Sequence, residues 1–323
     1  MRGGPITNLR QLRGVIPPMA TFFTEDGSID VNEFQSEARF LRAAGVNGIV
    51  VGGSTGEGAS LSADELGEIV TLCIEAVEGT IPVLAGVIAD TSREAVRLAR
   101  AAQRAGAVGL QIPPPHFYPV TDAKILASYY RAATDETGLP LIIYNVIPWA
   151  QVAIDSLQQL CSENPLIIGV KQSGYNIHAL AELLANLRGV IRIYSAIDDL
   201  LYPSFMLGSD GTISGTSSLF PRETIAMFRC VEKGKLQEAL RLHNAILPVW
   251  RTIEGTSFPG RFKYALKLRR RSSGKPRAPF SWPTKGDAER IEAALRAGGF
   301  LNGSYSDDAG QPMSAGDSVP ARS

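Results

Sequence analysis

Leu166-Ile167-Ile168-Gly169-Val170-Lys171 is a short apolar run that ends in a single charge, and the polar turn Gln172-Ser173-Gly174 follows it. An apolar, β-branched run without polar alternation is typical of a strand buried on both faces, as in a parallel sheet. Because burial disfavours the charged form of an amine, a lysine at the end of such a strand is expected to have a specific structural or chemical role. Two roles are possible for Lys171: it forms an ion pair with a carboxylate, or its neutral amine attacks a carbonyl carbon to form a Schiff base.

Comparable apolar runs recur at a regular spacing from Gly14 to Ile213, and longer amphipathic stretches separate them. Several of these stretches begin after a residue that favours a helix N-cap and end at a glycine. The N-cap candidates are Asp30, Ser62 and Thr91, and the end markers are Gly45, Gly79 and Gly106. The sequence therefore predicts eight strands, at residues 14–20, 48–52, 82–86, 107–112, 141–144, 167–171, 191–195 and 211–213.

Eight strand–helix units in succession favour a closed (β/α)8 TIM barrel over an open, doubly wound sheet. The open sheet is the alternative, but no Gly-x-Gly-x-x-Gly sequence opens the first unit. After the eighth strand the pattern is helical, at residues 222–233, 236–254, 262–271 and 287–297, and only the first of these is needed to complete the barrel. We expect an N-terminal segment at 1–13, the barrel at 14–234, a C-terminal helical extension at 235–299 and a disordered tail at 300–323.

The composition is that of a globular protein with balanced charge. Of 323 residues, 45% are hydrophobic and 20% are charged, and Lys plus Arg equals Asp plus Glu at 32 each. The basic cluster from Lys267 to Arg271 is interpreted as the solvated face of an amphipathic helix, so neither nucleic acid nor a membrane is expected as a partner. Three scattered cysteines, Cys73, Cys161 and Cys230, lack metal-ligand spacing and suit a reducing cytoplasm. No apolar run reaches the ~18 residues of a membrane span, and no apolar signal segment follows the start, so a cytoplasmic location is expected.

Candidate functional residues follow the strands, since the chemistry of such a barrel lies at the carboxyl ends of its strands. The second strand is followed by Gly52-Gly53-Ser54-Thr55-Gly56-Glu57, where glycines permit close backbone approach and the hydroxyls and amides can hold a carboxylate. A plain Gly-rich turn is the alternative. The fifth strand ends in Tyr144-Asn145, which places a phenol one strand before Lys171. The alternative for Tyr144 is a core tyrosine with a satisfied hydroxyl.

Taken together, Gly53-Ser54-Thr55-Gly56-Glu57, Tyr144-Asn145-Val146 and Gly169-Val170-Lys171 resemble the dihydrodipicolinate synthase / N-acetylneuraminate lyase family of class I aldolases. The likeness runs from about Gly14 to Lys267. It implies that Lys171 forms a Schiff base with pyruvate or another 2-oxo acid, and that Tyr144 shuttles protons.

The resemblance also implies a substrate site around these groups. Ser54 and Thr55 would bind the carboxylate, Ser54 would belong to the catalytic group, and Gly53 and Ile213 would contact the substrate. No metal and no cofactor beyond the covalent imine is implied. The family usually forms tetramers built as pairs of dimers, so we expect a homotetramer or a dimer.

The second half of the substrate site departs from the synthases of this family. His116 stands where synthases carry a tyrosine that enters a neighbouring subunit's relay, and Ile147-Pro148-Trp149-Ala150 stands where they carry a carboxylate-binding arginine. The loss of a carboxylate clamp and the gain of an indole argue against aspartate semialdehyde as the second substrate. His116 and Trp149 are therefore candidate substrate contacts, and a surface loop histidine is the alternative for His116.

The lyase branch is closer in some details. Asp198-Asp199 and Ser214-Gly215-Thr216 lie where the lyases contact the polyol of a sugar acid, so Asp198 and Ser214 are candidate contacts. The alternative for both is a helix cap or a loop turn.

We interpret the chain as a Schiff-base lyase that acts on pyruvate or another 2-oxo acid, with an aldehyde or a sugar-acid-like compound as co-substrate. A dehydratase or deaminase that uses the same imine is the alternative within enzymes. The alternative of another class is a 2-oxo-acid-binding paralogue without turnover.

Overall fold

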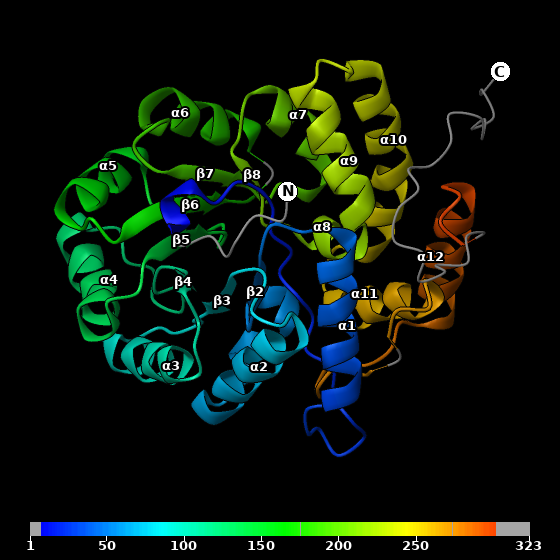
Figure 1. Cartoon of the computed structure of the whole chain (residues 1–323), viewed down its shortest axis with the longest axis horizontal. Helices are drawn as coiled ribbons and strands as arrows, with labels where there is room; N and C mark the ends of the chain where they lie inside the picture. The colour runs from blue at the N-terminus through cyan, green and yellow to red at the C-terminus, as the bar shows by residue number, and fades with distance from the viewer. Residues whose placement is uncertain (1–7, 175, 273, 302–323) are drawn as a thin grey trace.

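Eight parallel strands form one sheet in the order β1-β8-β7-β6-β5-β4-β3-β2, and helices surround it (Figure 1). The structure, a computed structural model, describes residues 8–174, 176–272 and 274–301. The strands are β1 (Gly14–Val15), β2 (Ile49–Val51), β3 (Val83–Gly86), β4 (Gly109–Ile112), β5 (Leu141–Asn145), β6 (Ile167–Gln172), β7 (Arg192–Ser195) and β8 (Gly211–Thr212).

Twelve α-helices and four short 3₁₀ helices lie in the described part of the chain. The α-helices are α1 (Val31–Ala44), α2 (Ala63–Ala76), α3 (Ser92–Arg104), α4 (Ala123–Thr137), α5 (Ile154–Glu163), α6 (Ile177–Leu187), α7 (Leu201–Met206), α8 (Gly215–Leu219), α9 (Pro221–Glu232), α10 (Leu236–Ile253), α11 (Phe258–Leu268) and α12 (Lys285–Ala297). The 3₁₀ helices are η1 (Leu9–Gln11), η2 (Ser54–Gly56), η3 (Gly58–Ser60) and η4 (Asp198–Leu200).

The sheet closes into a barrel where its first two strands meet. A bridge between Pro18 and Val50 joins the chain after β1 to β2, and the Met19 N–H donates to the Val50 carbonyl at 2.8 Å. β1 pairs with β8 on its other side. The expected (β/α)8 barrel with a C-terminal helical extension is confirmed, and the open-sheet alternative is excluded.

The predicted helix starts are confirmed by their capping bonds. Asp30 accepts from the Glu33 N–H, and Ser62 makes a reciprocal capping box with Glu65. Thr91 caps α3 in the same way as Asp30 caps α1. Each cap satisfies a backbone donor that the first turn of a helix leaves free.

The inside of the barrel is apolar at the amino ends of its strands. Leu9 and Leu12, from the N-terminal segment, pack there with inward-facing side chains such as Leu84 and Ile142. The Tyr194 hydroxyl donates to the Leu12 carbonyl at 2.8 Å and fixes this plug. The polar inward-facing side chains are therefore left to the opposite end, where the strands of such barrels carry their active sites.

The C-terminal extension packs as a group beside the barrel. Helices α10, α11 and α12 lie together on one side of the molecule, next to α9 (Figure 1). Phe300 and Leu301, which we assigned to the tail, pack against the core, and the Phe300 ring contacts the Phe220 ring at a tilt of 51°. The remainder of the predicted tail, and residues 1–7 of the N-terminal segment, lie outside the described residues.

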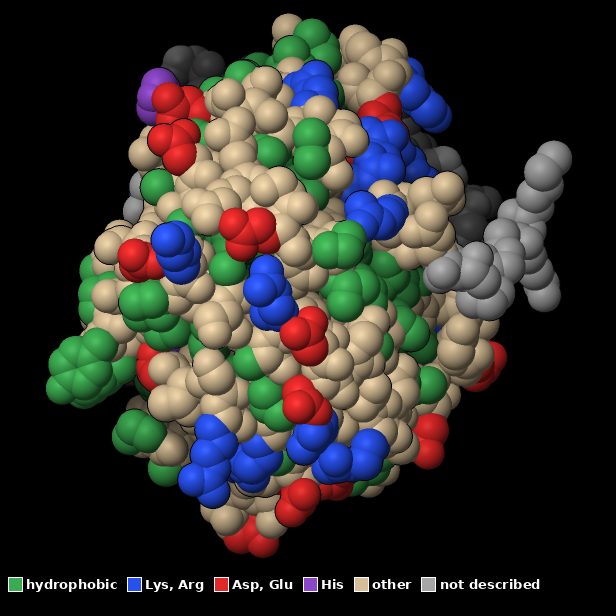
Figure 2. Space-filling model, turned by 90° about the vertical axis from the view of Figure 1, so that its left-hand side faces the viewer, with side chains coloured by type: hydrophobic (Ala, Val, Ile, Leu, Met, Phe, Trp, Pro, Cys, Tyr) green, Lys and Arg blue, Asp and Glu red, His purple; other side chains and the backbone are tan. Residues whose placement is uncertain are grey.

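The interpretation of residues 267–271 as a solvated cationic face was wrong for two arginines. Helix α11 ends at Leu268, so the chain turns inward: Arg271 pairs with Glu37, and Arg269 pairs with Glu223 at 3.0 Å. Burial raises the pKa of Glu37 and lowers the pKa of Arg269 to about 10. On the outer surface, basic and acidic side chains are interspersed over the face in Figure 2. None of the helices in the described ranges is both long and apolar enough to cross a membrane.

The seam between β1 and β8 has no room for a side chain, which predicts a large effect of Gly211→Ala. Gly211 has a φ of +148°, and a Cβ there would lie 1.9 Å from the Gly14 carbonyl oxygen. We expect a loss of about 3 kcal/mol or more in the free energy of unfolding, measured by urea titration. Gly45→Ala is the control. Gly45 has a φ of +85°, but a Cβ added there would meet no atom within 4 Å beyond its chain neighbours. This substitution should therefore cost only about 1–2 kcal/mol in the free energy of unfolding. Equal losses would contradict the steric account of the seam.

Candidate active site

Lys171 lies beside Tyr144 at the carboxyl ends of two neighbouring strands. Tyr144 in β5 pairs in register with Lys171 in β6, and both side chains are buried. The Lys171 Nζ lies 3.8 Å from the centroid of the Tyr144 ring. The Tyr144 hydroxyl donates to the Ser54 Oγ at 3.2 Å. The parallel register thus brings together an amine, a phenol and a hydroxyl from three different strand ends.

The loop after β2 is shaped by close backbone contacts. Gly52 has a φ of +71°, and a Cβ there would lie 2.5 Å from a methyl group of Leu66. Gly53 accepts backbone bonds from the Gly56 and Gly58 N–H groups, which folds the loop tightly over itself. Thr55 is buried, whereas Ser54 is exposed at the mouth. The first-turn N–H groups of a helix such as η2 have no acceptor within the helix, so they are available to a ligand carboxylate.

A buried ion pair holds this loop from below. Glu57, in a left-handed conformation at φ 55°, pairs with Lys263 of α11, and both side chains are almost fully buried. The other Glu57 carboxylate oxygen accepts a hydrogen bond from the backbone N–H of Arg277 at 2.9 Å. Lys263 also donates to the Lys275 carbonyl at 2.7 Å. Burial lowers the pKa of Lys263 to about 8, although Glu57 opposes this shift.

Asp198, after β7, faces the same mouth. Its carboxylate accepts the Thr216 N–H at 2.6 Å, and its carbonyl accepts the Thr216 hydroxyl at 3.2 Å. Burial raises the pKa of Asp198 to about 6, and the Thr216 bonds and the charge of Lys171 oppose that rise. The next residue, Asp199, turns away to an ion pair with Arg251 at 2.6 Å. Asp198 therefore joins the β7 and β8 loops next to Lys171.

Ser214 serves as a helix cap in the structure. Its hydroxyl accepts the Ser217 N–H at 3.2 Å at the start of α8, which is the structural alternative that the sequence left open. Ile213, directly before it, is fully buried among the inward-facing apolar side chains of the barrel. Ile213 lies in the barrel interior, whereas Ser214 is engaged within its own helix turn.

His116 and Trp149 are joined to one another at the rim. The Trp149 indole N–H donates to the His116 carbonyl at 2.9 Å, and the His116 N–H donates to the Asp90 carboxylate at 2.6 Å. Asp90 also accepts the Phe117 N–H at 2.8 Å. Trp149 remains 66% exposed, and Phe117 is 74% exposed. These bonds tie the loops after β3, β4 and β5 into one rim with exposed aromatic rings.

Three residues of the site were not anticipated from the sequence. Lys263 is 206 positions from Glu57, and no local pattern links the two. Asp90 carried no signal beyond its place after the third strand. Gln111 is fully buried inside the barrel, and its only signal was one amide within the apolar run of β4.

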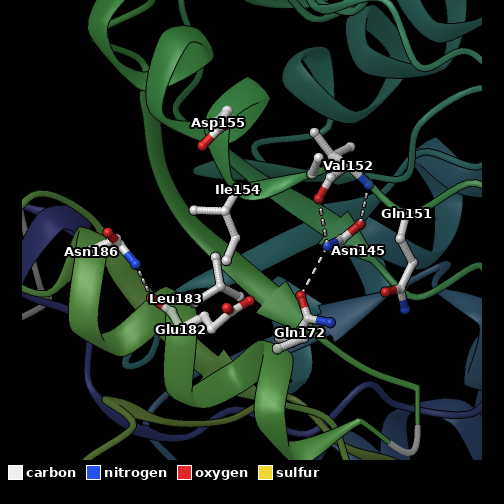
Figure 3. A pocket seen from close by; sticks show the side chains of 11 residues that line it. Asn145, Gln151, Val152, Ile154, Asp155, Gln172, Glu182, Leu183 and Asn186 are labelled. Carbon is white, nitrogen blue, oxygen red and sulfur yellow. Dashed lines mark hydrogen bonds between the residues drawn. The ribbon is translucent and has the colours of Figure 1, made fainter.

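An open pocket of about 450 Å³ lies outside the barrel, between α5 and α6. Figure 3 shows Asn145 and Gln172 at its inner wall, where the Asn145 amide donates to the Gln172 side-chain oxygen at 2.9 Å. Asn145 also bonds twice to Val152, which anchors the β5 loop. This pocket is separate from the amine of Lys171, which faces the barrel interior. Within the described ranges, no group of three or more His, Cys, Asp or Glu side chains is arranged to hold a metal ion.

Known proteins resemble this chain in both sequence and fold. The model of the dihydrodipicolinate synthetase family matches residues 11–297. A 4-hydroxy-tetrahydrodipicolinate synthase of Methanosphaerula palustris is 33% identical over 285 residues, which cover 87% of this chain and 96% of that protein. The synthase of the same name from Nitratidesulfovibrio vulgaris is 31% identical over 293 residues, 90% of this chain and all of that protein. The crystal structure of YagE, a prophage protein of that family from E. coli K12 in complex with pyruvate, matches with a TM-score of 0.84 and 26% identity, over 89% of this chain and 99% of YagE.

The buried pair predicts that Lys263→Met is strongly destabilising, because it leaves the Glu57 carboxylate buried without a cation. We expect a loss of about 3–5 kcal/mol in the free energy of unfolding. The double variant with Glu57→Gln should recover part of that loss, and Lys267→Met, at an exposed lysine of the same helix, should change little. A double variant no more stable than Lys263→Met would contradict a direct pairing.

The raised pKa of Asp198 predicts a pH-dependent stability. The folded protein holds this proton more tightly than the unfolded chain, so the group stabilises at low pH, and that contribution is lost as the pH rises from about 4 through about 6. Relative to Asp198→Asn, the native protein should lose at most about 1.4 kcal/mol per pH unit in this window. Urea titrations of both proteins between pH 4 and 8 measure the difference. If the free energy of unfolding of the native protein rose with pH relative to that of Asp198→Asn, the raised pKa would be contradicted.

Proposed function

Because the chain belongs to the dihydrodipicolinate synthetase family of carbon–carbon lyases, we propose that it acts through a Schiff base between Lys171 and a 2-oxo acid. The observation that carries this proposal is the buried Lys171 amine, 3.8 Å from the ring centroid of Tyr144, whose hydroxyl bonds to Ser54. An amine alone can pair with a carboxylate. An amine against a phenol that is itself oriented by a second hydroxyl is suited to proton transfer at a carbonyl.

The proposed reaction begins when the neutral Lys171 amine adds to the carbonyl carbon. The adduct oxygen receives one proton from the nitrogen and one from the Tyr144 hydroxyl, so water leaves and a protonated imine remains beside the Tyr144 phenolate. The Tyr144 phenolate takes a proton from the adjacent carbon and leaves an enamine. The enamine attacks the carbonyl carbon of an aldehyde and forms the new carbon–carbon bond, while the Tyr144 hydroxyl protonates the aldehyde oxygen. Water then hydrolyses the imine and returns the free amine. The reverse sequence is aldol cleavage, and the imine itself is the electron sink in both directions.

The carboxylate of the 2-oxo acid is assigned to the loop after β2. Gly53 allows close backbone approach, and Ser54 and Thr55 offer hydroxyls together with first-turn amides. Aimed donors of this kind are worth about 2.7–4 kcal/mol each in comparable settings. Ile213 lines the barrel side of the same site. YagE, whose structure was solved with pyruvate, supports a 2-oxo acid of this size as the common ligand.

The second substrate is assigned to the rim. The indole of Trp149 and the loop carrying His116 form a neutral wall where the synthases of this family carry an arginine, so we propose a co-substrate that is less anionic than aspartate semialdehyde. Asp198 at the mouth can bond to a hydroxyl of a sugar-acid-like aldehyde, whereas Ser214 is occupied as a cap. A homotetramer or dimer remains part of the proposal.

A dehydratase or deaminase would use the same imine and differ in the group that leaves the neighbouring carbon. Asp198 favours this second candidate in one respect: a carboxyl group with a pKa of about 6 can supply a proton to a departing hydroxide. A non-catalytic binding protein is the alternative of another class, and it has no need of a phenol over the amine.

The experiment that tests the proposal is reduction with borohydride in the presence of pyruvate or a panel of 2-oxo acids. Peptide mass spectrometry should locate the adduct at Lys171, and Lys171→Ala should abolish it. Lys267→Ala, at an exposed lysine, is the control and should label like the native protein. If no 2-oxo acid labels Lys171, the proposal of an enzyme is rejected in favour of a non-catalytic binding protein.

If Tyr144 transfers protons, a variant without its hydroxyl should form the Lys171 adduct more slowly while the amine stays in place. Tyr144→Phe should lower the rate of adduct formation by about 10²- to 10⁴-fold, because the proton donor and acceptor is lost. The control is Tyr118→Phe, at a tyrosine that is 80% exposed. Single-turnover trapping at a saturating 2-oxo acid concentration measures the rate, and equal rates for both variants would remove Tyr144 from the mechanism.

A further inference from the structure

Gln111 places a carboxamide inside the barrel. Its neighbours in β4, Leu110 and Ile112, belong to the outer core between the strands and the helices, so the Gln111 side chain points inward. The residue is fully buried, and neither its amide nitrogen nor its amide oxygen has a hydrogen-bond partner within the described chain. Buried polar groups are nearly always paired, so an amide with both ends unpaired indicates a missing partner.

The amide lies under the catalytic mouth. Gln111 pairs in register with Gly86 on one side, which has no side chain, and with Ile142 on the other, two residues before Tyr144. A Cβ on Gly53 would lie 3.5 Å from the Gln111 amide nitrogen. The carboxamide therefore reaches the start of the loop assigned to the carboxylate, and the backbone of that loop covers Gly86. It forms a polar floor between that loop and the Tyr144 strand.

We infer that Gln111 determines which 2-oxo acid the site accepts, an inference that rests on the proposed function. Ser54 and Thr55 are assigned to the carboxylate and Lys171 to the carbonyl carbon, so the part of the donor left to meet the floor is its third carbon. The carboxamide hydrogen-bonds to a hydroxyl group on that carbon. The preferred donor class is thus 2-oxo acids with a hydroxyl group at C3, rather than pyruvate.

The chemistry of the amide fits this class of donor. A carboxamide both donates and accepts, as a hydroxyl group does, so one C3 hydroxyl can satisfy either end. The methyl group of pyruvate offers neither partner and would leave the amide unpaired under the bound imine. Sites built to bond a substrate hydroxyl discriminate strongly against the analogue that lacks it.

The test compares pyruvate with 3-hydroxypyruvate in the native protein and in Gln111→Leu, which keeps the size of the side chain and removes its polar atoms. The concentration dependence of borohydride labelling at Lys171 gives the affinity for each acid. We expect the native protein to bind 3-hydroxypyruvate at least about tenfold more tightly than pyruvate, and the leucine variant to lose that preference. Gln103→Leu, at an exposed glutamine of α3, is the control and should keep the native ratio.

Thermal unfolding supplies a second readout. Since Gln111→Leu removes unpaired buried polar atoms, its Tm should equal or exceed that of the native protein, whereas a structural amide would leave a less stable variant. Gln111→Met serves in the same way if the leucine variant does not fold. The role of Gln111 would be overturned if the native protein bound 3-hydroxypyruvate and pyruvate with similar affinity. It would also be overturned if the Gln111 variants kept the native ratio of the two affinities. If neither acid labels Lys171 of the native protein, the proposed function itself falls.

Discussion

The pairing of β5 with β6 is the constraint on which the proposed site depends. It sets Tyr144 directly beside Lys171, and no loop has to order for the two side chains to meet. Because both residues lie on strands that are buried on both faces, a shift in register would require the barrel to repack. The amine and the phenol are thus positioned by the same hydrogen bonds that hold the fold together.

The remaining groups of the site are held by bonds from outside the sheet. The Glu57–Lys263 pair fixes the loop after β2 to the C-terminal extension, so α11 supports the proposed carboxylate site. Asp90 links the rim loops through the His116 N–H, and Asp198 links the last two loops through Thr216. The extension is therefore part of the support of the mouth as well as a cover for the barrel.

Local patterns in the sequence were sufficient for the number and order of the strands, the helix caps and the convergence of Lys171, Tyr144 and Ser54, because parallel strands deliver their last residues to one edge. The predicted first strand, 14–20, was too long, since β1 ends at Val15. Long-range pairings were not accessible in this way. Arg269 and Arg271 read as a solvated face, yet they meet Glu223 and Glu37 from distant helices. The burial of Gln111 required the orientation of β4 to be known, although the amide stood out within an apolar run.

A crystal structure of the protein after reduction with a 2-oxo acid tests the central claim most directly. We predict a covalent bond from the Lys171 Nζ to the second carbon of the acid, with the carboxylate against Ser54 and Thr55 and the Tyr144 hydroxyl next to the new bond. A carboxylate bound elsewhere in the mouth, or an adduct on another lysine, would contradict the arrangement of the site.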